Sequence, residues 1–271
     1  MRVAVLGLGE AGRIYAAELA EQGAEVTATD PLATSAPPAV TLASDIPAAV
    51  REAEIVLSLV GGGAAASALD TALPAMRPEA LYADLNTLAP DEKRRLASRA
   101  AERGIAFVDV AVLAPVPRAG LRTPLALSGP GAGRLRSFLE QLDVPTTDAG
   151  PDAGGAAGLK LLRSVFMKGL AALMFEAVTA AREVGAEEWV TGQIASELGP
   201  DGDALVQRLL EGTPVHAVRR EAEMRDARTY LETLGAAHPM TDGTLAWLQA
   251  LAARSDDAGP AASGSEASGP A

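Results

Sequence analysis

The sequence predicts an α/β protein, a doubly wound and mostly parallel sheet, followed by an all-helical C-terminal domain. An apolar run at residues 2–6 leads directly into glycines at positions 7, 9 and 12. Strand-like and helix-like patterns then alternate up to about residue 150, which is typical of a parallel sheet with crossover helices. After residue 150 only helical periodicity remains. We therefore expect a dinucleotide-binding domain over 1–150, a helical domain over 151–253 and a disordered tail over 254–271.

The first turn carries the pattern G-x-G-x-x-G. Gly7 permits a tight turn, Gly9 lets the backbone lie against a pyrophosphate, and Gly12 allows the next helix to pack closely. The N-terminus of that helix offers free N–H groups to phosphates. This is the fingerprint of a Rossmann domain, although an α/β domain with a glycine turn and no nucleotide is the alternative. The predicted phosphate-binding residues are Gly7, Leu8, Gly9, Glu10, Ala11 and Gly12.

A second predicted strand, 25–29, ends in Asp30, about where a carboxylate binding the adenosine ribose hydroxyls is expected. A carboxylate repels a 2′-phosphate, and residues 31–33 supply no arginine to receive one. These features favour NAD, without excluding NADP. The alternative for Asp30 is a solvated loop acid.

The remaining elements follow in order. Further strands are predicted at 40–42, 54–60, 81–86, 105–109 and 125–128, with helices at 46–53 and from Pro90. Val60 is the last residue of a predicted buried strand, and Gly61 is the first of three consecutive glycines. We therefore expect the backbone at these two residues to approach the cofactor.

The second half reads as one long helix, 154–184, followed by helices at 187–198, 204–210, 215–234 and 241–253, with turns at 199–200, 212–214 and 238–239. The expected core-facing stripe of the long helix is Leu159, Leu162, Phe166, Leu170, Leu173 and Ala177.

Composition restricts the function. A net charge of −12 disfavours nucleic acid and anionic membrane surfaces as partners. The chain has no cysteine and two histidines without an acidic pair, so neither disulfides nor a metal centre are expected. No apolar stretch reaches membrane-spanning length, and the chain begins with its first strand, so a cytoplasmic location is expected.

Lys160 and Ser164 are the catalytic candidates. They lie about 40° apart on the long helix, on a different face from the apolar stripe. A lysine beside a nicotinamide can protonate a carbonyl oxygen or deprotonate an alcohol. The plain alternative is a solvated lysine on an amphipathic helix.

A domain with the glycine fingerprint comes first, G-G-A-A-G-L-K at 154–160 then opens a long helix, and a helical domain follows. The order of these parts resembles that of the β-hydroxyacid dehydrogenase and 6-phosphogluconate dehydrogenase superfamily. The segments 111–117 and 160–169 are most similar to the branch with a DUF1932 C-terminal domain. The resemblance implies that Lys160 is the catalytic lysine and that Asn86 contacts the nicotinamide ribose.

Two departures from the family pattern affect the substrate. Ser164 stands where the family usually has asparagine, and Leu113-Ala114-Pro115 replaces the Ser-Gly-Gly that binds a substrate carboxylate. The replacement loop offers fewer N–H groups and no hydroxyl, so the usual binding of a small hydroxy acid is in doubt. Several polar residues lie near this loop or on a late helix: Arg118, Arg122, Thr123, Ser128 and His216. We interpret them as solvated or structural residues, and contact with a substrate anion is the alternative.

We therefore predict an NAD-dependent oxidoreductase that interconverts a small-molecule alcohol and its carbonyl, with Lys160 as general acid/base and Ser164 orienting the substrate. The alternatives are an imine reductase of the same architecture, which commonly carries another residue at the lysine position, and a dinucleotide-binding redox sensor without turnover. The long helix is apolar over more than one stripe, so we expect a homodimer through the helical domain. The residues that widen the apolar surface are Leu170, Ala171, Leu173, Met174, Phe175 and Val178.

Overall fold

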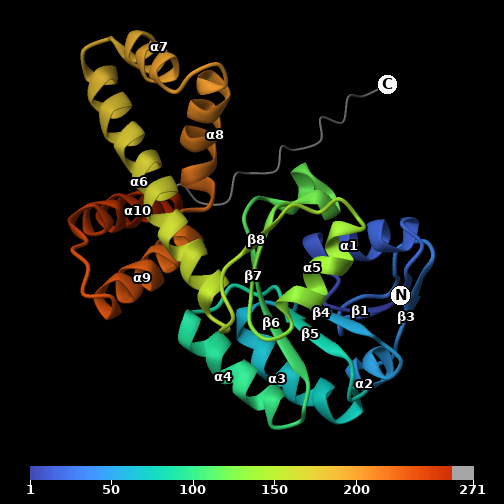
Figure 1. Cartoon of the computed structure of the whole chain (residues 1–271). Coiled ribbons are helices and arrows are strands. Elements are labelled where there is room, and N and C mark those ends of the chain that lie inside the picture. Colours follow the sequence, from blue (N-terminus) through green and yellow to red (C-terminus); the bar gives the residue numbers. More distant parts are fainter. Residues whose placement is uncertain (258–271) are drawn as a thin grey trace, which may run out of the picture. The chain divides into compact units, whose positions relative to one another are not determined.

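The computed structural model describes residues 1–257 of the chain, which divide into two compact units. The first unit is Met1–Lys160 and the second begins at Leu161. The first contains all the strands of the described residues, and the second is helical (Figure 1). The break falls inside one long helix, so the two units share a continuous element.

The first unit is built on an eight-stranded sheet with the strand order β3-β2-β1-β4-β5-β6-β7-β8. Only the β6–β7 pair is antiparallel, which confirms the predicted doubly wound, mostly parallel sheet. Its strands are β1 (Arg2–Leu6), β2 (Glu25–Thr29), β3 (Val40–Leu42), β4 (Ile55–Ser58), β5 (Leu81–Asp84), β6 (Ala106–Val112), β7 (Leu125–Ser128) and β8 (Thr146–Asp148).

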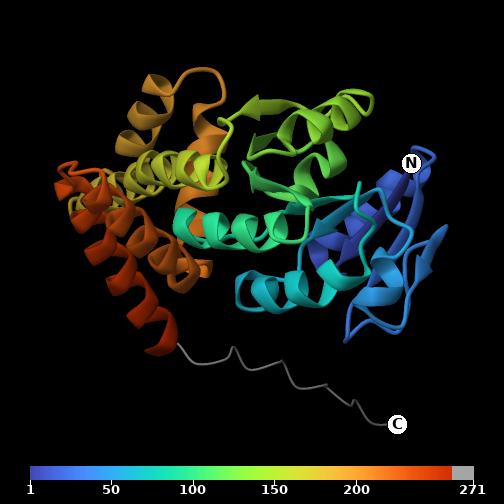
Figure 2. The same ribbon diagram turned by 60° about the horizontal axis from the view of Figure 1, so that its bottom comes forward.

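Helices cover both faces of this sheet because successive strand residues point to opposite sides. Val3 and Val5 pack with α1 and α5, whereas Ala4 and Leu6 pack with α2, α3 and α4. Figures 1 and 2 both show α3 and α4 side by side. The helices are α1 (Glu10–Glu21), α2 (Ile46–Val50), α3 (Gly62–Ala72), α4 (Pro90–Ala101) and α5 (Ala132–Glu140), with single 3-10 turns η1 (Leu73–Ala75), η2 (Val116–Arg118) and η3 (Gly120–Arg122).

The second unit is formed by the rest of α6 (Gly155–Glu183) and by α7 (Glu187–Glu197), α8 (Gly202–Val215), α9 (Ala217–Thr233) and α10 (Pro239–Asp257). Two apolar clusters hold it together. One joins Leu161 of α6 to Met224 of α9 and Leu248 of α10, and the other joins Met174 of α6 to Leu209 of α8. Within the described residues no helix combines the length and apolar character needed to cross a membrane.

Several predicted boundaries were wrong. The turn predicted at 212–214 belongs to α8, because Pro214 occupies the last turn of that helix and Thr213 bonds back to the carbonyl of Leu209. The predicted tail began at residue 254, but α10 continues through Asp257; the rest of that prediction, 258–271, lies outside the described residues. The predicted strand at 105–109 continues to Val112.

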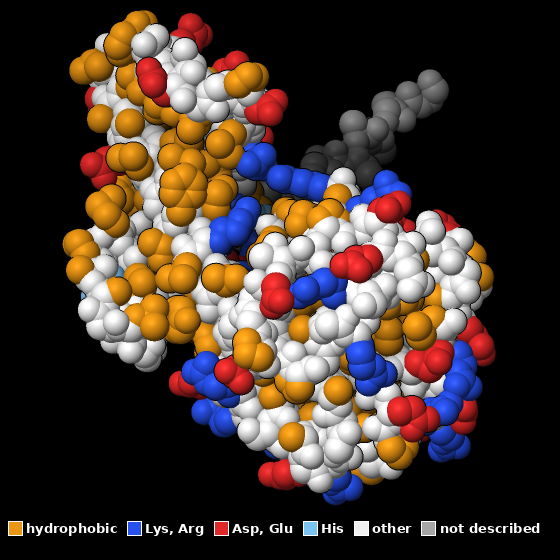
Figure 3. Space-filling model, viewed as in Figure 1, with side chains coloured by type: hydrophobic (Ala, Val, Ile, Leu, Met, Phe, Trp, Pro, Cys, Tyr) orange, Lys and Arg blue, Asp and Glu red, His pale blue; other side chains and the backbone are white. Residues whose placement is uncertain are grey.

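The predicted inner stripe of α6 was also wrong, because most of that stripe faces outward. Phe166 is 66% exposed and Leu173 57%, and Leu159 and Leu162 are also exposed. The buried face instead presents Leu161, Ser164, Ala171, Met174 and Val178. Apolar residues occur nearly all around this helix, so periodicity alone could not decide which face is covered. Figure 3 shows hydrophobic side chains gathered over the helical unit.

Candidate functional site

The turn between β1 and α1 has the geometry that a phosphate-binding turn requires. Gly7 has φ +95°, and a Cβ on it would lie 2.5 Å from the carbonyl oxygen of Leu59. A Cβ on Gly12 would lie 1.9 Å from the carbonyl oxygen of Gly7. Among the described residues, nothing lies within 4 Å of the Cβ position of Gly9, the residue before the first turn of α1. The backbone N–H groups of that first turn are therefore accessible to an anion.

Asp30 lies beside this turn, just beyond the end of β2. Its Oδ2 accepts a hydrogen bond from the Leu8 N–H at 2.7 Å, and its Oδ1 accepts one from the Leu32 N–H at 2.8 Å. These bonds fix the carboxylate against the glycine turn and leave each oxygen a further lone pair for a ribose hydroxyl. The structure thus brings Asp30 together with the predicted phosphate-binding residues.

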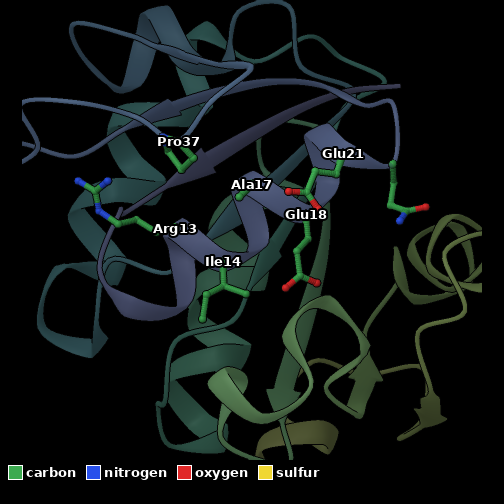
Figure 4. A pocket seen from close by; sticks show the side chains of 7 residues that line it. Arg13, Ile14, Ala17, Glu18, Glu21 and Pro37 are labelled. Atoms are coloured by element: carbon green, nitrogen blue, oxygen red, sulfur yellow. The ribbon is translucent and has the colours of Figure 1, made fainter.

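Sequence reasoning missed a cation that contacts the loop after Asp30. Arg13 on α1 donates a hydrogen bond to the carbonyl of Ser35, in the loop that follows Asp30, at 3.1 Å. It also lines an open hollow with Pro37, and Figure 4 shows it directed away from the acidic Glu18 and Glu21 on the same helix. The contact spans 22 residues along the chain, so local sequence around Asp30 could not reveal it.

The ends of β4 and β5 bring together two more predicted positions. Asn86, which is 5% exposed, accepts a hydrogen bond at Oδ1 from the Gly61 N–H at 2.8 Å. Its Nδ2 donates to Ser58 Oγ and to Asp84 Oδ2, each at 3.0 Å. Asn86 therefore holds the backbone after Val60 in place at the carboxyl edge of the sheet.

A buried charge network, not predicted from the sequence, lies beneath this edge. Lys93 of α4 is 1% exposed, and its Nζ lies 2.6 Å from Asp84 Oδ1 and 3.2 Å from Asp109 Oδ1. Asp84 and Asp109 are register partners on β5 and β6, and both are 0% exposed. One lysine is thus paired with two adjacent carboxylates, which need a cationic partner because an unpaired charge is costly to bury.

The same network anchors the start of α6. Asp109 Oδ2 accepts hydrogen bonds from the Gly154 N–H at 3.0 Å and the Ala157 N–H at 2.9 Å. Ser128 Oγ accepts one from the Ala156 N–H at 2.9 Å. A carboxylate at a helix N-terminus is stabilised by the helix dipole, so these contacts fix the first turn of the helix that carries Lys160.

Lys160 lies within reach of the β5 edge. Its Nζ donates a hydrogen bond to Thr87 Oγ1 at 3.0 Å, and Thr87 directly follows Asn86. The two residues are 73 positions apart in sequence. The structure therefore places the Lys160 ammonium against the residue that follows Asn86, and it identifies Thr87 as a partner that sequence reasoning missed.

Ser164 is in the second unit, and the residue is 5% exposed. It accepts a hydrogen bond from Lys168 Nζ at 3.1 Å, and Lys168 also pairs with Glu223 of α9 at 2.8 Å. Burial lowers the pKa of Lys168, while the Glu223 carboxylate raises it. This second lysine was not singled out from the sequence, although it follows Ser164 at the four-residue spacing that links neighbours on a helix.

The segment after β6 is fixed by internal contacts. The Leu113 N–H donates to the carbonyl of Pro124, and the Leu121 N–H donates to Glu18 Oε2 of α1. Thr123 is buried and bonds the carbonyl of Gly120, so it is structural, as is Ser128. Arg122 pairs with Asp143. Among residues 1–257, no group of three or more metal-ligating side chains is arranged to hold an ion.

Comparison with known proteins identifies both halves of the chain. Residues 2–124 match the NAD binding domain of 6-phosphogluconate dehydrogenase, and residues 181–251 match DUF1932, a domain of unknown function. The first match covers the glycine turn, Asp30, Gly61 and Asn86.

Solved structures share the fold over nearly the whole length. A conserved hypothetical protein from Sinorhizobium meliloti is 29% identical, with a TM-score of 0.76, over 96% of this chain and 91% of that one. The 3-hydroxyisobutyrate dehydrogenase of Mycobacterium tuberculosis is 21% identical, with a TM-score of 0.79, over 93% and 94%. An imine reductase from Streptomyces aurantiacus is 25% identical, with a TM-score of 0.60, over 96% and 95%.

The glycine turn, the anchored start of α6 and the two family matches lead to one assignment. The chain belongs to the β-hydroxyacid dehydrogenase-like superfamily, with an NAD-binding domain of the 6-phosphogluconate dehydrogenase type and a DUF1932 C-terminal domain.

Proposed function

We propose that the protein is an NAD-dependent oxidoreductase that interconverts an alcohol and its carbonyl compound. The observation that carries this proposal is the hydrogen bond from Lys160 Nζ to Thr87 Oγ1, at the sheet edge where Asn86 and Gly61 meet. The glycine turn and Asp30 supply the dinucleotide-binding features at the same edge.

The residues present fit a bound dinucleotide: the open Cβ position of Gly9 and the accessible first turn of α1 suit a pyrophosphate, and Asp30 suits ribose hydroxyls. A dinucleotide bound by these residues would supply the hydride for the carbonyl carbon, or would receive it when an alcohol is oxidised. Lys160 donates a proton to the carbonyl oxygen as the alcohol forms, and takes it back when an alcohol is oxidised. Thr87 holds the Lys160 ammonium in position, and the proton of the Ser164 hydroxyl is available to orient the substrate.

For the cofactor we propose NAD in preference to NADP. The Asp30 carboxylate would face the 2′-phosphate of NADP, and like charges at close range repel. Arg13, which contacts the loop after Asp30, works against this preference, because a guanidinium can bind a phosphate.

A second candidate function is the reduction of an imine. The segment after β6 supports this candidate. Leu113-Ala114-Pro115 lacks the hydroxyl and glycines that bind a carboxylate in hydroxyacid dehydrogenases, and an imine substrate does not need them. An ammonium at Lys160 can protonate an imine nitrogen as well as a carbonyl oxygen. A redox sensor that binds the dinucleotide without turnover is the third candidate.

We propose that the protein is a homodimer that pairs through the outward face of α6. The exposed stripe on this helix includes Leu162, Phe166 and Leu173. Covering such side chains contributes about 1.5–3 kcal/mol for each large apolar residue, and the partner's identical stripe is self-complementary in a two-fold dimer. Trp189 of α7, which is 68% exposed, adds a further large apolar side chain to the same unit.

The function is tested by measuring NADH absorbance with a panel of hydroxy acids, aldehydes, ketones and cyclic imines, using a Lys160→Met variant as the blank. The proposal expects turnover of an alcohol or carbonyl compound by the native protein and not by the variant. Turnover of imines alone would establish the second candidate. Tight NADH binding without turnover of any class would favour the sensor.

A further inference from the structure

The buried Asp84–Lys93–Asp109 network contacts two separate parts of the first unit. On one side, Asp84 accepts two hydrogen bonds from Asn86, one from its main-chain N–H at 3.1 Å and one from its side-chain amide at 3.0 Å. On the other side, Asp109 accepts hydrogen bonds from two main-chain N–H groups at the start of α6. The Lys93 ammonium joins the two carboxylates. A continuous chain of contacts therefore runs from the end of β5 to the first turn of α6.

Asn86 lies where the second half of a dinucleotide is expected. In a doubly wound sheet a dinucleotide crosses the carboxyl edge at the point where the strand order reverses. The strand order places that point between β1 and β4. The glycine turn after β1 and Asp30 after β2 serve the adenosine half, so the nicotinamide half belongs over the ends of β4 and β5. Gly61 and Asn86 follow those two strands, and a hydrogen bond of 2.8 Å joins them.

The start of α6 is packed closely against α4, the helix that carries Lys93. Gly154 has φ +97°, and a Cβ on it would lie 2.7 Å from the carbonyl oxygen of Pro90, the first residue of α4. Lys160 follows about one helical turn after the residues that Asp109 holds, and it belongs to the same compact unit. A change in the orientation of this first turn therefore moves the Lys160 ammonium.

Anchoring a helix does not by itself require three buried charges. Ser128, an uncharged residue, already accepts a hydrogen bond from the Ala156 N–H in the same turn. Apolar residues of similar volume often replace a buried ionic group without loss of stability. A fully connected polar network does, however, fix one arrangement of the parts that it joins. The parts joined here are the edge of the sheet at Asn86 and the helix that carries Lys160.

The position of Asp109 requires hydrogen-bond acceptors on both of its oxygens. Oδ1 faces the Lys93 ammonium at 3.2 Å, and Oδ2 faces the N–H groups of Gly154 and Ala157. An asparagine accepts at one atom and donates at the other, so its NH₂ group would face either the ammonium or the helix. Asp109→Asn thus breaks one link of the chain, and it leaves Lys93 and Asp84 balanced one to one.

We infer that the Asp84–Lys93–Asp109 network couples the nicotinamide half of the cofactor site to the start of α6, with Asp109 as the positioning residue for Lys160. A dinucleotide that contacts Asn86 fixes the first turn of α6 through this network. Because coupling between two sites is reciprocal, an ordered first turn also strengthens binding at Asn86. The role of Lys160 as proton donor rests on the proposed function, whereas the coupling itself requires only that the dinucleotide binds.

Calorimetric titration of the full chain with NADH, and separately with ADP, tests the coupling. ADP carries the adenosine and the pyrophosphate but lacks the nicotinamide and its ribose. We expect Asp109→Asn to weaken NADH binding by about 5-fold or more and to change ADP binding by less than about 2-fold. Asp148→Asn is the matched control, since Asp148 also accepts a main-chain N–H bond, from Gly150, but pairs with Arg136 outside the network. It should change neither affinity.

Hydrogen exchange at the start of α6 separates coupling from a purely structural role. In the native protein, saturating NADH should slow exchange of the amides of residues 154–157 by about 3-fold or more, and saturating ADP should not. In Asp109→Asn this effect of NADH should be lost. A purely structural anchor would instead raise exchange in the variant with and without ligand, and would leave the effect of NADH intact.

The inference is overturned if NADH protects residues 154–157 equally in the native and Asp109→Asn proteins. It is also overturned if Asp109→Asn weakens ADP and NADH binding by the same factor, as measured for variants whose circular dichroism matches the native protein. These outcomes are separate from those of the proposed function. Coupled NADH binding without turnover of any substrate class would retain the network's role and refute the oxidoreductase. Turnover by a protein that shows no coupling would do the reverse.

Discussion

Replacing Lys93 by methionine removes the only cation of the buried Asp84–Lys93–Asp109 network in the described structure. The two carboxylates are register partners on neighbouring strands, and neither is exposed to solvent. The Lys93 ammonium lies within 3.2 Å of both and also donates to the main-chain carbonyl of Asp84 at 2.7 Å. Methionine fills similar space but leaves two adjacent buried negative charges without a counterion.

Breaking a buried ion pair by removing one partner costs about 3–5 kcal/mol. For a domain of this size that corresponds to a fall of roughly 6–20 °C in the melting temperature. Thermal unfolding followed by circular dichroism measures it. Arg95→Met is the matched control, because Arg95 is an exposed cation on the same helix and its loss should change stability by less than about 0.5 kcal/mol. Equal melting temperatures for the two variants would refute the charge network.

Three further predictions concern the cofactor and the assembly. Asp30→Ser should narrow the preference for NAD over NADP by about 10-fold or more, measured by fluorescence titration of both cofactors; an unchanged preference would return Asp30 to a structural role. Gly12→Val should abolish tight NADH binding, because its Cβ would overlap the Gly7 carbonyl oxygen; normal binding in the same titration would contradict the turn geometry. Phe166→Glu should convert a dimer to a monomer in light scattering, since it places a charge in the exposed α6 stripe; a native protein that is already monomeric would contradict the dimer.

Much of the first unit is predictable because its signals are local. The glycine turn, the β2 strand before Asp30 and the strand at Leu125–Ser128 each depend on a few adjacent residues. Elements with weak local signals were missed. The polar β8 strand, Thr146–Asp148, has only three residues. Helix α5, Ala132–Glu140, begins with small residues that are similar to those of the loop before it, so its start has no clear local signal.

The site could be predicted only in part because its connections are distant in sequence. Asn86 and Lys160 could be identified by motif, but the Lys160–Thr87 bond joins residues 73 positions apart. The bonds of Asp109 to the start of α6 span 45 and 48 positions. Lys93 resembles a solvated lysine on a charged helix, and only the sheet register shows that it faces two carboxylates.

The orientation of α6 shows a different limit. A helix that is apolar around most of its circumference has no single stripe for periodicity to detect. Phe166 was therefore predicted to face the core and is exposed, while Ser164, predicted to lie on a different face from the core-facing stripe, is buried. Packing against α9 and α10 through Leu161 decides the orientation.

The most direct test of the oxidoreductase assignment is single-turnover kinetics of Lys160→Met beside the native protein, with the dissociation constant for NADH measured on the same samples. The account predicts that the rate of the chemical step falls by about 10²-fold or more while the NADH dissociation constant changes by less than about 2-fold, because Lys160 acts on the substrate proton and not on the dinucleotide. A Lys160→Met protein that keeps a near-native rate would contradict the account, since the proton donor would then be another group.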